Sequence, residues 1–149
     1  MDITWLTPRL AVGGGIWNAE NMAKVARAGI THIIDMQIEF DDRQLSPSDH
    51  GIEVLWNPTD DDFEPKPAKL FLDGVQFAKV AFRRSDARLF IHCAAGVHRA
   101  PMMALAVLSS IDRMSVEDAR QLIEDKRPAA DFAEVYVRSV EDFLAEHEA

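Results

Sequence analysis

The stretch "FIHCAAGVHRAP", from Phe90 to Pro101, holds the only cysteine of the chain. It overlaps the apolar run "RLFIH", which predicts a short buried strand ending at His92. Small residues follow Cys93, Arg99 stands six positions after the cysteine (99 minus 93), and Pro101 suits the first turn of a helix. The stretch therefore predicts a strand, a tight loop and a helix, in that order.

A loop of this kind, between a strand and a helix, can cradle an oxyanion. Backbone N–H groups of residues 94–99 can point inward, Gly96 permits a turn that a Cβ would obstruct, and the helix directs its positive end at the same point. The planar fork of Arg99 can hold two phosphate oxygens at once. Because helix N-termini and nearby cations favour the thiolate form, we expect Cys93 to be a nucleophile beneath a bound phosphate. The expected substrate-binding residues are Ala94, Ala95, Gly96, Val97, His98 and Arg99.

The rest of the chain alternates strands and helices before it becomes wholly helical. Segment 3–12 predicts two short strands around the Thr7-Pro8 turn, and Asn18 is the expected N-cap of the first helix. Periodicity predicts strands at 31–36, 52–56 and 88–92, a polar loop at 39–51, helices at 17–29, 68–84, 101–111 and 115–126, and a last helix that carries Phe132, Val135, Val140, Phe143 and Leu144. We therefore expect a single α/β domain over residues 1–149, with a central, mostly parallel sheet flanked by helices.

Composition limits the classes of partner. Of the 149 residues 48% are hydrophobic, enough to bury the core of one domain, and the formal net charge is -9. This acidity disfavours broad binding to nucleic acid or to anionic membranes, so an anionic substrate needs a local site. A single cysteine excludes an internal disulfide framework and suits a reducing compartment. Since neither a signal-peptide pattern nor an apolar run of membrane-spanning length is found, we expect a cytoplasmic protein. We also expect a monomer.

The sequence "HCAAGVHRA" resembles the signature loop of the cysteine-dependent protein tyrosine and dual-specificity phosphatases, which reads H-C-x-x-G-x-x-R followed by Ser or Thr. The resemblance extends to "ITWLTPRLAVGG", to "AGITHIIDM" and to "EDKRP" with the final helix. It implies a phosphatase that hydrolyses phosphate monoesters through a phosphocysteine intermediate, without a cofactor. Phosphotyrosine, phosphoserine or phosphothreonine in proteins, small phosphorylated metabolites and RNA ends stay open as substrates at this point.

The same resemblance implies a general acid. In that family an aspartate in a mobile loop, roughly thirty residues before the cysteine, protonates the leaving oxygen. This chain offers Asp60, Asp61 and Asp62 in the matching loop. When the helix after this loop is aligned with the family's by Phe71 and Phe77, the alignment favours Asp61, which lies 32 positions before Cys93 (93 minus 61). We therefore expect Cys93, Arg99 and Asp61 to be the catalytic residues.

One residue departs from the family pattern, because Ala100 stands where relatives have Ser or Thr. In relatives that hydroxyl stabilises the thiolate as it leaves the phosphocysteine. The first alternative is therefore a phosphate-binding module with slow turnover, and the second is another cysteine-loop enzyme such as a sulfurtransferase or an arsenate reductase. We expect His92 to pack behind the loop and His98 to lie at its rim rather than to act as a catalyst. The five histidines show no ligand spacing with each other or with Cys93, so no metal is expected.

Overall fold

The computed structural model describes residues 1–147 and holds a five-stranded sheet in the order β1-β2-β5-β3-β4. The strands are β1 Ile3–Thr7, β2 Leu10–Gly13, β3 His32–Gln37, β4 Glu53–Thr59 and β5 Leu89–His92. β1 and β2 pair antiparallel around the expected turn, whereas β2, β5, β3 and β4 run parallel to one another. The expected mostly parallel sheet is confirmed, and β5, which leads to Cys93, is its central strand.

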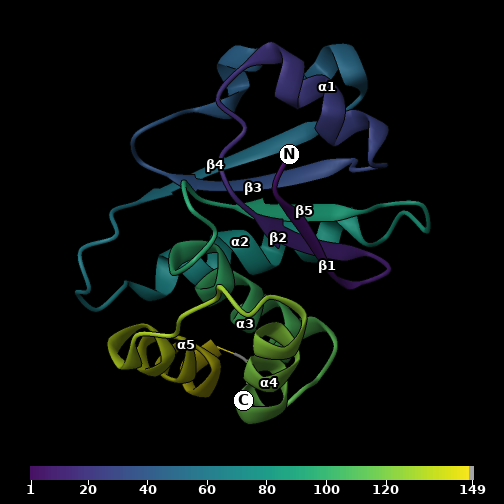
Figure 1. Cartoon of the computed structure of the whole chain (residues 1–149). Coiled ribbons are helices and arrows are strands. Elements are labelled where there is room, and N and C mark those ends of the chain that lie inside the picture. The colour runs from purple at the N-terminus through teal and green to yellow at the C-terminus, as the bar shows by residue number, and fades with distance from the viewer. Residues whose placement is uncertain (148–149) are drawn as a thin grey trace.

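The α-helices cover the two faces of this sheet unequally. They are α1 Ala19–Arg27, α2 Ala68–Ala81, α3 Arg99–Ile111, α4 Val116–Lys126 and α5 Glu134–His147. α1 lies on one face, where Met22 and Val25 pack against Ile33 and Phe90 of the sheet. The other four helices gather on the opposite face (Figure 1). The helical cluster predicted on one face is therefore present.

Side-chain caps fix two of the predicted helix starts. Asn18 accepts a hydrogen bond from the Asn21 N–H at 2.8 Å, and Ser115 accepts one from the Asp118 N–H at 3.0 Å. These bonds satisfy amides that the first turn of a helix leaves without an intrahelical partner. Both helices therefore begin where the sequence places a polar cap.

Several predicted boundaries were wrong in detail. α1 and α2 are shorter than the helices predicted at 17–29 and 68–84, and Phe132 lies just before α5 rather than within it. The expected loop at 39–51 contains two short 3-10 helices, η1 Asp42–Leu45 and η2 Pro47–His50. The helix expected from Pro101 begins two residues earlier, at Arg99, because a proline is tolerated throughout a first turn whose amides have no intrahelical acceptor. The earlier start places both Arg99 and Ala100 in the first turn of α3.

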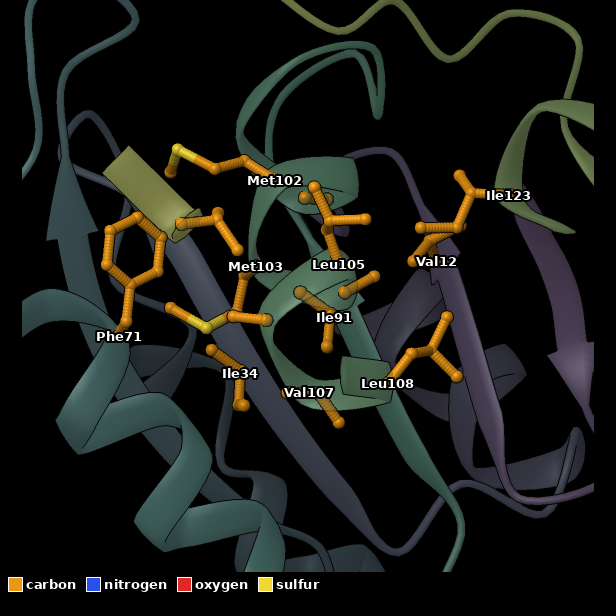
Figure 2. Packing of buried hydrophobic residues seen from close by; sticks show 14 of the residues in the cluster. Val12, Ile34, Phe71, Ile91, Met102, Met103, Leu105, Val107, Leu108 and Ile123 are labelled. Carbon is orange, nitrogen blue, oxygen red and sulfur yellow. The ribbon is translucent and has the colours of Figure 1, made fainter. Parts of the chain in front are cut away.

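α3 is the central helix of the protein, as its nearly uniform apolar sequence predicts. Met103 and Leu105 lie in one cluster with Phe71 of α2, Ile91 of β5 and Ile123 of α4 (Figure 2). Because the core surrounds this helix, the position of its N-terminus is fixed by packing. Within residues 1–147 no helix combines the length and the apolar character that a membrane crossing requires.

The site follows from the direction of the parallel strands. The loops that leave β2, β3, β4 and β5 all start at the same edge of the sheet, because parallel strands present their carboxyl ends together. These loops carry Gly14, Glu39, Asp61 and Cys93. Residues that are far apart in the sequence therefore meet at this edge.

Candidate active site

Cys93 follows β5 directly and is almost completely buried. Its N–H donates to the Gly13 carbonyl at 3.4 Å, and its Sγ accepts a hydrogen bond from the Ala100 N–H at 3.4 Å. Ala100 is the second residue of α3, so one of the free amides of that helix is directed at the sulfur. The helix N-terminus and this N–H both favour negative charge on Cys93.

The loop between Cys93 and α3 turns its carbonyl groups outward. The donors lie outside the loop: Ala94 O accepts from Gly15 N (2.9 Å), Ala95 O from Arg127 Nη2 (3.3 Å), Gly96 O from Arg127 Nε (2.8 Å) and Val97 O from Asp131 N (2.9 Å). In a trans peptide the C=O of one residue and the N–H of the next point in opposite directions, and the described residues contain no cis peptide. The N–H groups of residues 95–98 therefore point into the loop, where an oxyanion would meet them.

Gly96 has the role that the sequence predicts. Its φ is +68°, in the left-handed region, and a Cβ placed on it would lie 2.4 Å from Arg127 Nη2 and 2.6 Å from the Gly13 carbonyl carbon. A side chain at this position would push the loop away from the residues that hold its carbonyl groups.

Arg99 is buried and held in a fixed orientation. Its Nη1 and Nη2 donate to the two carboxylate oxygens of Glu39 at 2.7 and 2.8 Å, and Nη1 also donates to the Thr59 carbonyl at 2.9 Å. The hydrogen bond with Glu39 raises the pKa of Arg99, and the same bond lowers the pKa of Glu39. Sequence reasoning missed Glu39, whose one signal is its place just beyond the carboxyl end of β3.

These contacts leave one edge of the Arg99 guanidinium available. Three of its five N–H donors go to Glu39 and Thr59, and among the described residues Nε has no hydrogen-bond partner. The Nε–H and the remaining Nη2 hydrogen lie along the same edge of the planar group. Glu39 therefore fixes Arg99 without using the fork that would hold two phosphate oxygens.

The three aspartates of the loop after β4 have different surroundings. Asp62 pairs with Lys66 at 2.8 Å, whereas Asp60 accepts a bond from Lys66 through its backbone carbonyl. Asp61 contacts the Cys93 loop, since its Oδ2 lies 2.9 Å from Nδ1 of His98. Asp61 Oδ1 accepts a hydrogen bond from the Tyr136 hydroxyl at 2.8 Å. The geometry thus favours Asp61, the same aspartate that the sequence alignment favoured.

His92 lies behind the loop, where it is completely buried. Its Nε2 bonds to a carboxylate oxygen of Asp42, and its Nδ1 lies 3.2 Å from the carbonyl oxygen of Cys93. Burial alone would lower the pKa of His92, but the hydrogen bond to Asp42 and the charges of Asp42 and Asp35 outweigh it and raise the pKa. The two carboxylates thus favour the protonated form of His92, whose ring lies next to the backbone of Cys93.

Asp35 completes a buried cluster with Asp42 and His92. Its carboxylate accepts the N–H groups of Gln37 and Asp42, at 2.9 and 3.0 Å, and burial raises the pKa of Asp35 to about 7. The three side chains offer ligand atoms within 4.8 Å of one another, so by residue type they could hold a metal ion. An ion there would have to replace the direct bond between His92 and Asp42, and the cluster fits a shared-proton network better than a metal centre.

Arg127 ties the loop to the start of the chain. Besides the carbonyls of the loop, its guanidinium binds both carboxylate oxygens of Asp2, at 2.9 and 2.7 Å, and the Thr4 hydroxyl at 2.8 Å. The hydrogen bond from Arg127 lowers the pKa of Asp2. The motif "EDKRP" contains Arg127, but it does not predict these bonds because Asp2 lies 125 positions away.

A cavity of about 350 Å³ lies elsewhere, near the C-terminal end of α3. It is lined by the turn between β1 and β2 and by residues that include Phe82, Val107 and Ile111. Cys93 is at the opposite end of α3, so this cavity is separate from the site described above.

An oxyanion cradle built around a buried thiol is the arrangement on which cysteine-dependent phosphatases rely, and this protein falls in that class by its fold and its loop. Residues 15–144 match the family model described as "Dual specificity phosphatase, catalytic domain". The chain therefore belongs to the dual specificity phosphatase family.

Curated relatives agree with this assignment, and a solved structure shares the fold. The chain is 28% identical over 130 residues to a probable rhodanese domain-containing dual specificity protein phosphatase of Dictyostelium discoideum, covering 87% of this chain and 26% of that protein. It is 27% identical over 135 residues to dual specificity protein phosphatase 13B of Homo sapiens, covering 85% and 64%. It thus spans less than two thirds of the length of either relative. The crystal structure of human DUSP28 has the same fold, with a TM-score of 0.84 at 19% identity over 100% of this chain and 97% of that chain.

Proposed function

We propose that this chain is a phosphatase that hydrolyses phosphate monoesters through a phosphocysteine intermediate. In the first step Sγ of Cys93 attacks phosphorus, so an S–P bond forms while the bond from phosphorus to the leaving oxygen breaks. Asp61 gives its proton to that leaving oxygen. In the second step water attacks phosphorus, the S–P bond breaks, and the ionised Asp61 takes a proton from the water. The cycle returns Cys93 and Asp61 to their starting states, and no step uses a metal.

The observation that carries this proposal is the set of donors around Cys93. The Ala100 N–H is directed at the sulfur, the N–H groups of residues 95–98 point into the loop, and one edge of Arg99 is available. Negative charge that moves onto the equatorial oxygens in the transition state would meet donors that are already in place. Such an arrangement favours transfer of a phosphoryl group over mere burial of a thiol.

The test is sustained release of inorganic phosphate from p-nitrophenyl phosphate. We expect release well beyond one equivalent per protein, and Cys93→Ser should abolish it while the variant still binds phosphate, because the cradle consists of backbone and Arg99. Release of p-nitrophenol that stops at one equivalent, without sustained release of inorganic phosphate, would favour the slow phosphate-binding module. Formation of thiocyanate from thiosulfate and cyanide, without phosphate release, would favour a sulfurtransferase.

The acid assignment has its own test. Asp61→Asn should lower kcat by about 10²- to 10⁴-fold on phenyl phosphate, whose leaving group needs a proton, and by less on p-nitrophenyl phosphate. Parallel Asp60→Asn and Asp62→Asn variants are the matched controls, since both aspartates lie in the same loop. A larger defect in either control would move the acid to that position.

Phosphotyrosine in proteins is the substrate that the rim of the site fits best. Phe63 is 52% exposed and its ring meets the His98 ring edge-to-face, with the centroids 5.0 Å apart. An exposed aromatic face next to the cradle can pack against the ring of a phosphotyrosine, which phosphoserine lacks. Phe63→Ala should therefore raise KM for a phosphotyrosine peptide and leave KM for a phosphoserine peptide unchanged.

A further inference from the structure

The side chain of Asp61 is held from two sides. The Tyr136 hydroxyl donates to its Oδ1 at 2.8 Å, and Nδ1 of His98 lies 2.9 Å from its Oδ2. His98 in turn has a second carboxylate partner, because its Nε2 lies 3.2 Å from Oδ2 of Asp131. These contacts join the loop after β4, the Cys93 loop, α5 and the segment just before α5.

We propose that His98 and Tyr136 are positioning residues that keep the carboxyl group of Asp61 in place for proton transfer, and that Asp131 orients the His98 ring. This inference rests on the proposed role of Asp61 as the general acid.

The ring of His98 suits both protonation states of Asp61. A carboxylate oxygen is a hydrogen-bond acceptor, so Asp131 favours the form of the His98 ring with the proton on Nε2. With Nε2 protonated, Nδ1 of a neutral ring accepts a hydrogen bond from protonated Asp61. When Asp61 is ionised, the ring takes up a proton from solvent at Nδ1 and donates a hydrogen bond from there to the carboxylate. The same contact thus persists when Asp61 acts as an acid and when it acts as a base.

Tyr136 also keeps its contact with Asp61 in both protonation states, but always as the donor. Its oxygen accepts the N–H of Phe63 at 3.1 Å, and its own hydrogen goes to Oδ1 of Asp61. Burial raises the pKa of Tyr136 to about 12, so the hydroxyl keeps its proton throughout the neutral range. The guanidinium of Arg99 also interacts electrostatically with Asp61. Tyr136 is therefore a permanent donor to Asp61.

The loop around Asp61 is fastened to the same residues. Phe63 has a φ of +57°, which is strained for a bulky side chain, and its ring stacks on Tyr136 with a centroid distance of 5.8 Å and an interplanar angle of 8°. The Lys66 N–H donates to the Ser139 hydroxyl of α5 at 3.0 Å. With the loop held at Phe63 and at Lys66, the carboxyl group of Asp61 is oriented before the reaction, which saves the entropy of orienting it.

The test compares leaving groups, because a positioning role and a general structural role differ there. His98→Ala should lower kcat on phenyl phosphate by about ten- to a hundredfold, with kcat on p-nitrophenyl phosphate and both KM values within about twofold of the wild type. His98→Asn should recover most of the loss, since an amide can replace Nδ1 as donor or acceptor. Tyr136→Phe should show the same selective loss, and Asp131→Asn a smaller one. Glu134→Gln, an exposed change at the start of α5, is the matched control and should have no effect.

A double-variant cycle separates this inference from the proposed function. If His98 acts through Asp61, adding His98→Ala to Asp61→Asn should cost nothing further on phenyl phosphate. A second loss of full size, an equal loss on both substrates, or no loss in His98→Ala would each overturn the positioning role. If Asp61→Asn itself leaves phenyl phosphate hydrolysis unchanged, the acid assignment fails instead. Should His98→Ala not fold, the same outcomes are read from His98→Asn and Tyr136→Phe.

Discussion

Replacing Arg99 by lysine tests whether two hydrogen-bond donors of the guanidinium are left free to bind the phosphoryl group. Arg99 has five N–H donors, of which three are taken by Glu39 and Thr59 and two lie along the available edge. Lysine has three donors, and those same acceptors would satisfy all of them. Each lost charge-assisted hydrogen bond to the phosphoryl oxygens is worth about 1.5–3 kcal/mol, so the loss of two amounts to about 3–6 kcal/mol. We therefore expect Arg99→Lys to lower kcat/KM by about 10²- to 10⁴-fold.

The assay is kcat/KM for p-nitrophenyl phosphate, together with competitive inhibition by inorganic phosphate. Both should weaken in Arg99→Lys while the thermal midpoint stays close to that of the wild type, because the ion pair with Glu39 is kept. Adding Glu39→Ala to Arg99→Lys should then recover part of the activity, since it releases lysine donors for the substrate. An Arg99→Lys variant within tenfold of the wild type would refute the count, as would a double variant that is no better than Arg99→Lys alone.

Two further predictions concern the sulfur and the buried cluster behind it. Ala100→Ser should raise the steady rate and leave the initial burst of p-nitrophenol unchanged in stopped-flow measurements, if breakdown of the phosphocysteine limits turnover; a wild type without a burst would contradict this. The pKa of Asp35, raised by burial to about 7, means that the native state holds this proton more tightly than the unfolded chain. Its contribution to stability is therefore complete below about pH 4 and is lost as the pH rises through about 7. The pKa of His92 is also raised, so its contribution is complete below about pH 6.5 and is lost at higher pH. The free energy of unfolding, measured by urea denaturation, should fall over this pH range, and it should fall less steeply in Asp35→Asn. A rise in the wild type would contradict the raised pKa values of the buried cluster.

The fold could be predicted because each element carries its own signal. The strand ending at His92, the caps at Asn18 and Ser115, and the uniformly apolar α3 all depend on neighbours within a few positions. The start of α3 at Arg99 was missed because Pro101 is acceptable at several positions of a first turn.

The partners of the site residues could not be predicted in the same way. Glu39 lies 60 positions from Arg99, and Tyr136 lies 75 positions from Asp61. Periodicity and capping carry no information about such pairs, because the pairs depend on which loops leave the sheet at the same edge. His98 illustrates the limit: its place at the rim follows from the loop, but its bond to Asp61 follows only from the fold.

Ala100 shows how a local departure from the family pattern changes meaning once the structure is known. From the sequence alone, Ala100 replaces the hydroxyl of the family's Ser or Thr by a methyl group, so the sulfur loses one hydrogen-bond donor. In the structure the N–H of the same residue already lies 3.4 Å from Sγ, because α3 begins at Arg99 and leaves this amide without an intrahelical acceptor. The ring of His92 also contacts the Cys93 backbone from behind the loop. The sulfur of this chain thus keeps a backbone donor that no substitution at position 100 except proline removes, although it lacks the family's hydroxyl. The burst measurement on the wild type and Ala100→Ser reports whether the backbone donor alone stabilises the leaving thiolate enough for rapid turnover.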